Sequence, residues 1–247
     1  MKRYIRQVNC REHFEEAIRS APFILVKYEL NCQTDEADKN LITGLLEKAS
    51  ILSQRVNPQP ANAETEIRQT DTLLANAIAG VVSEYFWKLF LNSDEDIVKE
   101  TDFNEAATQI DLEVNNSKKR IEVRSSFPRN GIHFALCHPQ YQFDILGPYE
   151  NTTYKPGEIA KEFYVRTLFE MEVPTDIIDG IHEDGFCVYL TGGATHQMMK
   201  TTGQYEIKTL RPEDAIGMVG QARYRVVPFS RALDTFQIKA LIQQAAV

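Results

Sequence analysis

Residues 109–125 read Gln-Ile-Asp-Leu-Glu-Val-Asn-Asn-Ser-Lys-Lys-Arg-Ile-Glu-Val-Arg-Ser, which is two alternating runs around a polar turn. In both runs every second residue is apolar, and these residues are Ile110, Leu112, Val114, Ile121 and Val123. Such alternation gives one apolar and one charged face, as half-buried strands have. The residues between the runs, Asn115 to Lys118, are types that favour turns. The stretch therefore predicts a β-hairpin with strands at 109–114 and 120–125.

The charged face of this hairpin carries an unusual pair. If the hairpin is symmetric about the bond between Asn116 and Ser117, Glu113 faces Arg120 and Asp111 faces Glu122. Two carboxylates directly opposite each other, about 5 Å apart at Cβ, destabilise a sheet. A bound Mg²⁺ or Mn²⁺ would remove the repulsion, because carboxylate oxygens suit these ions. Two alternatives stay open: relief by Arg124 alone, and a solvated hairpin face in another register.

The rest of the chain predicts an α/β fold with a mixed central sheet flanked by helices. We expect helices over 11–20, 38–54, 71–91, 156–170 and 231–246, and further strands over 23–28, 133–137, 141–146, 185–190 and 223–229. We interpret residues 1–247 as one domain, with a core at about 70–170, an N-terminal extension at 1–69 and a C-terminal part of the sheet at 171–247.

Composition and charge exclude several classes of protein. The chain has 247 residues, of which 43% are hydrophobic and 25% charged, with 12 Gly and 10 Pro, so it is neither collagen-like nor disordered by composition. The formal net charge of −8 excludes a uniformly basic nucleic-acid-binding coat. Basic residues do outnumber acidic ones in the last quarter, from Thr191 onward.

The four cysteines, Cys10, Cys32, Cys137 and Cys187, include no C-x-x-C pair, which argues against a zinc ribbon or a dithiol redox motif. The first residues lack the apolar run of a signal peptide, and no stretch reaches the ~20 apolar residues of a membrane span. We therefore expect a soluble cytoplasmic protein with reduced thiols and no membrane partner. His133 and Cys137 would share one face of a strand, but ordinary packing is a simpler interpretation than a soft-metal site.

The Asp111–Glu122 pair also resembles a known family. Asp111 on one strand, followed by Glu122-Val123-Arg124 on the next, is similar to the PD-(D/E)XK nuclease superfamily, whose pattern is an Asp followed by Glu-x-Lys. The resemblance implies a restriction-endonuclease-like core. It also implies metal ligation by Asp111, Glu122 and the backbone carbonyl of Val123, with Arg124 at the lysine position. Arginine stays protonated and cannot act as a base, but it can hold a phosphate.

The superfamily often has a further acidic residue on the preceding helix, and Glu84 matches this position. Glu84 aligns along the helix with the small residues Ala77 and Gly80, which would let the helix approach the sheet closely. The alternative is an i,i+4 pair between Glu84 and Lys88 on a solvated face.

Together the residues and the resemblance imply a Mg²⁺-dependent endonuclease of restriction type, a hydrolase that acts on double-stranded DNA. Asp111, Glu122, Arg124 and Glu84 are the expected catalytic residues. A homodimer would suit cleavage of both strands at a symmetric site, and basic and aromatic residues in 200–211 and 223–225 could face the DNA. Two alternatives are a repair or branched-DNA nuclease and a non-catalytic DNA-binding or regulatory protein that keeps the fold.

Overall fold

The computed structural model of the protein describes residues 1–16, 19, 21–56, 69–101, 111–150, 160–210 and 222–246. Within them a seven-stranded sheet has the order β1-β2-β8-β7-β5-β4-β3, in which only β5 and β7 are parallel neighbours. The strands are β1 (Lys2–Val8), β2 (Phe23–Asn31), β3 (Val98–Glu100), β4 (Leu112–Val114), β5 (Arg120–Ser126), β7 (Phe163–Leu168) and β8 (Asp184–Thr195). The predicted α/β fold with a mixed central sheet flanked by helices is confirmed.

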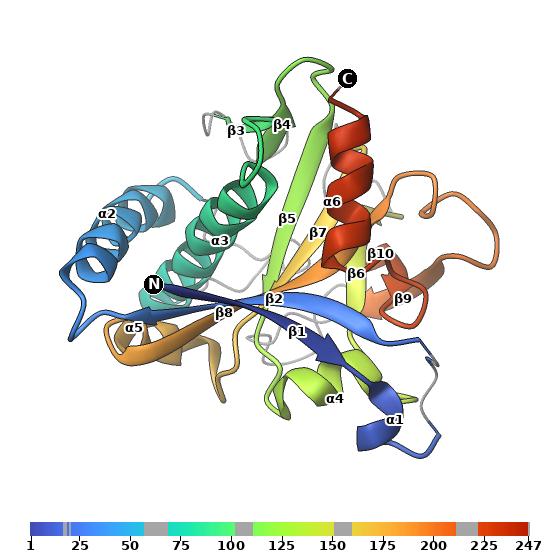
Figure 1. The fold of residues 1–247 in the computed structure, drawn as a ribbon, viewed down its shortest axis with the longest axis horizontal. Helices are drawn as coiled ribbons and strands as arrows, with labels where there is room; N and C mark the ends of the chain where they lie inside the picture. The colour runs from blue at the N-terminus through green and yellow to red at the C-terminus, as the bar shows by residue number, and fades with distance from the viewer. Residues whose placement is uncertain are drawn as a thin grey trace.

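One face of the sheet is covered by helices (Figure 1). These are α2 (Glu36–Ser53), α3 (Thr70–Leu91), α5 (Ile177–Gly180) and α6 (Thr235–Gln244). Asp35 accepts hydrogen bonds from the first amides of α2, and Asp234 does the same for α6. Helix α3 lies between α2 and the sheet, so it is buried on several sides, and Trp87 is fully enclosed. The predicted helices at 38–54 and 71–91 are confirmed, and the one at 231–246 is confirmed over α6.

The opposite face is covered by α1 (Cys10–His13), α4 (Gly131–Cys137) and a second sheet of β6 (Asp144–Tyr149), β10 (Ala222–Pro228) and β9 (Glu206–Leu210). The strand predicted at 133–137 is wrong, because this segment is helix α4. Ile132, Ala135 and Leu136 are buried, and this spacing places them on one face of a helix. The predicted strand at 223–229 corresponds to β10, and the one at 141–146 is displaced to β6.

Two further predictions about secondary structure fail. Residues 163–168 form the central strand β7 rather than the second half of a helix at 156–170, of which 156–159 lie outside the described residues. All six residues of β7 are buried, and a strand covered on both faces lacks the alternation that identifies strands in sequence. The helix predicted over 11–20 is the single turn α1, with 17, 18 and 20 outside the description, and strand β1 was not predicted.

Cys10 and Cys137 form a disulfide between α1 and α4, so the expectation of four reduced thiols is wrong for these two. Cys32 and Cys187 are free thiols. No helix within the described ranges is long and apolar enough to span a membrane.

Candidate functional site

The predicted hairpin register is confirmed where the structure describes it. Glu113 pairs with Arg120 and Leu112 pairs with Ile121 in the β4–β5 ladder. Asp111 directly precedes β4, whereas Gln109 and Ile110 lie outside the described residues. The backbone N–H of Val123 donates a hydrogen bond of 2.7 Å to Asp111 Oδ2. The Asp111 carboxylate is therefore held against β5, the strand that carries Glu122.

Glu122 is buried, with 6% of its surface exposed, and it lies between two cations. Arg124 Nη2 is 2.6 Å from Glu122 Oε1, and Lys161 Nζ is 2.8 Å from Glu122 Oε2. Arg124 retains a side-chain exposure of 31%, whereas that of Lys161 is only 1%. Each oxygen of Glu122 thus has its own positive partner, one of them almost fully enclosed by protein.

Sequence reasoning missed Lys161. It lies two residues before β7, in a segment predicted to be helical. The parallel pairing of β7 with β5, which sets Glu122 beside Tyr164, brings this lysine to the carboxylate. The only local signal was a Lys-Glu pair before the three apolar residues Phe163 to Val165, which is too common to indicate a site.

The acidic side chains are electrostatically unfavourable where they are placed. Burial, followed by repulsion from Glu122, raises the pKa of Asp111 to about 7, although the Val123 hydrogen bond opposes the change. Burial, followed by repulsion from Asp111, raises the pKa of Glu84 to about 8. Conversely, Glu122 is the main cause of a raised pKa for Arg124. The negative charges of Asp111 and Glu122 therefore act on the Glu84 carboxyl across the interface between α3 and β5.

No family model matches the chain, and no curated protein or solved structure matches it either. The resemblance to the nuclease superfamily therefore rests on the residues of this chain.

A divalent cation is the group that the resemblance implies, and the donor set can be tested against it. Among the described residues, no group of three or more His, Cys, Asp and Glu side chains is arranged to hold a metal ion. Glu122 is not free to bind a metal ion in this arrangement, because each of its carboxylate oxygens contacts a cationic side chain. The chemistry nevertheless fits: Glu84, Asp111 and Glu122 in their charged forms outnumber Arg124 and Lys161 by one negative charge. Burial and mutual repulsion favour the protonated forms of Asp111 and Glu84 in the metal-free protein, and a bound Mg²⁺, which prefers carboxylate oxygens, would favour their charged forms.

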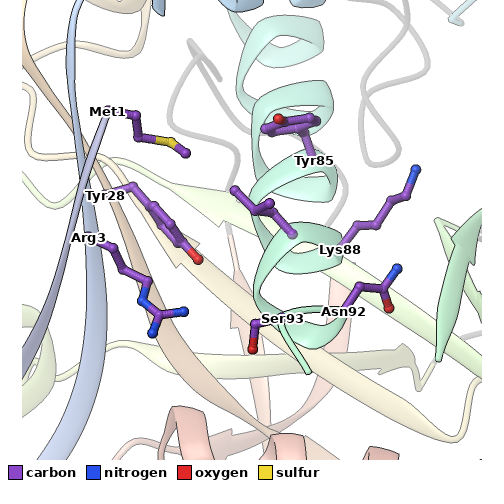
Figure 2. A pocket seen from close by; sticks show the side chains of 8 residues that line it. Met1, Arg3, Tyr28, Tyr85, Lys88, Asn92 and Ser93 are labelled. Carbon is purple, nitrogen blue, oxygen red and sulfur yellow. The ribbon is translucent and has the colours of Figure 1, made fainter. Parts of the chain in front are cut away.

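A pocket of about 390 Å³ lies elsewhere, between the N-terminal strands and α3. Its lining residues are Met1, Arg3, Tyr28, Tyr85, Lys88, Leu89, Asn92 and Ser93, and Figure 2 shows Arg3 and Tyr28 facing the α3 side chains across it. The lining contains no carboxylate side chain, and none of Glu84, Asp111 and Glu122 belongs to it. The pocket therefore does not coincide with the acidic pair.

The basic residues expected to face DNA are partly neutralised within the protein. Lys208 Nζ lies 2.8 Å from Asp144 Oδ1, and Arg225 Nε lies 2.5 Å from Glu150 Oε2. Lys200 is exposed, and Arg211 lies outside the described residues. Among the described residues, the positive groups in ion-pair contact with Glu122 are Arg124 and Lys161.

Proposed function

We propose that this protein is a Mg²⁺-dependent endonuclease that hydrolyses phosphodiester bonds of double-stranded DNA, as restriction-type enzymes do. The proposal depends on one observation: Asp111 is held on β5 beside Glu122, and this acidic pair is flanked by Arg124 and Lys161. Adjacent anionic and cationic groups suit a metal ion and a phosphate side by side.

The metal ligands in this proposal are Asp111, Glu122 and the carbonyl of Val123. When bound, Mg²⁺, or Mn²⁺ in its place, would supply an activated water and neutralise charge on the leaving oxygen. Arg124 is the more exposed of the two cations, so it is the one that can leave Glu122 and clamp the scissile phosphate. Lys161 is buried and keeps Glu122 in place. Glu84, with its pKa of about 8, holds a proton at neutral pH and can exchange it with water near the pair.

The same geometry favours a second candidate through one specific observation. Both oxygens of Glu122 are ion-paired within the chain, an arrangement that holds the site together without a metal. A non-catalytic protein that binds DNA and keeps the nuclease architecture would have this property. A repair or branched-DNA nuclease differs from the leading proposal only in its substrate.

Incubation with supercoiled plasmid and Mg²⁺ distinguishes these functions. We expect nicked or linear products from the wild type and a loss of at least about 100-fold in Asp111→Asn and Glu122→Gln, because each removes a proposed metal ligand. Glu113→Gln is the matched control, since Glu113 lies on the same hairpin but its carboxylate forms ion pairs with Lys99 and Lys118, away from the proposed metal ligands. We expect this variant to cleave like the wild type.

Three outcomes decide the matter. DNA binding without cleavage in Mg²⁺ or Mn²⁺ would favour the non-catalytic protein. Cleavage of forked or branched oligonucleotides but not of plasmid would indicate the repair class. Equal cleavage by Glu122→Gln and Glu113→Gln would remove the acidic pair from the mechanism. The oligomeric state, measured by sedimentation with and without DNA, tests the proposed homodimer.

A further inference from the structure

We propose that Cys10, His13, His133 and Cys137 form a second metal site, a tetrahedral Zn²⁺ site that exists when the disulfide between Cys10 and Cys137 is reduced. Its ligands come from α1 and α4, on the face of the sheet opposite to the large helices. The site is independent of the proposed nuclease chemistry, because it uses none of the same residues.

Helix spacing arranges the four side chains in two pairs. Cys10 and His13 are three residues apart on α1, and His133 and Cys137 are four residues apart on α4. Either spacing places two side chains next to each other on one helix face. Each helix therefore presents one sulfur and one imidazole in the same direction.

Two contacts show that these faces meet. The disulfide joins the sulfurs, with the Cα atoms of Cys10 and Cys137 5.0 Å apart. The rings of His13 and His133 lie with their centroids 3.9 Å apart and their planes inclined by 56°. Like pairs with like across the α1–α4 contact, so the sulfur pair and the imidazole pair lie about one helical turn, ~5 Å, from each other along the two helices.

This donor set is the one that structural zinc sites use. Zinc prefers two to four thiolates with imidazoles completing the tetrahedron, at about 2.3 Å for sulfur and 2.0–2.1 Å for nitrogen. Tetrahedral geometry at these bond lengths places two sulfurs about 3.8 Å apart. The cysteines are buried, at 1% and 0% exposure, whereas both histidines are exposed, so an ion can reach the site from the imidazole side.

The oxidised chain offers no zinc site here, because sulfurs bonded to each other cannot act as thiolate ligands. Reduction by a dithiol transfers two electrons and two protons to the disulfide, giving two thiols, while the dithiol becomes a disulfide itself. Zinc then displaces the two thiol protons as it binds. The disulfide between α1 and α4 is thereby replaced by a zinc ion that links the same two helices, and this form can exist in a reducing compartment.

A disulfide alone would not explain the histidines. They lie on the surface, where imidazole rings gain little from packing against each other, yet their tilted rings are in contact beside the only disulfide among the described residues. A zinc bridge accounts for the positions of all four side chains.

The test is titration of the full chain with Co²⁺, a spectroscopic probe for tetrahedral zinc sites, after reduction by a phosphine and removal of the reductant under argon. We expect one Co²⁺ per chain, with a thiolate charge-transfer band and the intense visible bands of tetrahedral Co²⁺, all displaced by one Zn²⁺. Oxidised protein should show no such bands. His13→Ala and His133→Ala change exposed residues and should fold, and each should weaken binding at least about tenfold.

Thiols elsewhere supply the matched control. The Cys32→Ser/Cys187→Ser variant should bind Co²⁺ as the wild type does, because neither residue belongs to the cluster. Absence of the tetrahedral bands in reduced wild type would overturn the proposal. So would unchanged affinity in both histidine variants, or bands that persist in Cys10→Ser/Cys137→Ser.

Discussion

Replacing Asp111 by Asn should stabilise the metal-free protein, and the gain should depend on pH. The structure raises the pKa of Asp111 from 3.8 to about 7, chiefly by burial and by repulsion from Glu122. At about 1.4 kcal/mol per pH unit, the charged form carries a penalty on the order of 4 kcal/mol in the folded state. Asn keeps the shape and can still accept the Val123 hydrogen bond. Because the variant still buries a polar amide, we expect Asp111→Asn to regain only part of this penalty, so that its free energy of unfolding exceeds that of the wild type by about 2 kcal/mol at pH 8.

The sign of the pH dependence follows from proton binding. Between about pH 4 and pH 7 the folded protein holds a proton on Asp111 that the unfolded chain has released. Wild-type stability from this group is therefore full below about pH 4 and is lost as the pH rises to about 7. The Asn variant has no such dependence, so its advantage should be near zero at pH 4, grow up to about pH 7 and stay constant above it.

Thermal denaturation in EDTA across this pH range measures the effect. For a chain of this length, about 2 kcal/mol corresponds to roughly 4–8 °C in Tm. Glu113→Gln is again the control, because the pKa of Glu113 is lowered rather than raised, so removing its charge should not stabilise the protein. Destabilisation by Asp111→Asn at pH 8, or a gain that does not change with pH, would refute the electrostatic reasoning.

Two further predictions concern the same site. Mg²⁺ at ten times its Kd should stabilise the wild type by about 1.4 kcal/mol and raise its Tm by a few degrees. The Tm of Asp111→Asn should not rise. An equal rise in both proteins would show that the ion binds elsewhere. Lys161→Met should lower the free energy of unfolding by about 3 kcal/mol in urea denaturation, because it removes one of the two ion pairs of the buried Glu122 carboxylate. Lys161→Arg should lower it less. A change below about 0.5 kcal/mol in Lys161→Met would contradict the importance of this ion pair.

Local patterns predicted the hairpin and the large helices well. The β4–β5 register followed from the alternation of 109–125, because a shift by one residue would have exposed the apolar face. Helices α2 and α3 carry enough periodic apolar residues to be found without tertiary information. Residues 163–168 failed because β7 is covered on both faces and so lacks a period-two alternation, whereas 133–137 failed because five residues are too few to separate one turn of helix from a strand.

The sequence by itself determined the hairpin that brings Asp111, immediately before β4, to Glu122 on β5, since hairpin pairing is a local property with a period of two. Only the tertiary structure decided what surrounds them. Lys161 reaches Glu122 through the parallel pairing of β5 with β7, and Cys10 meets Cys137 across 127 residues of chain. Such contacts depend on how distant elements pack, and no residue pattern near either partner specifies the other.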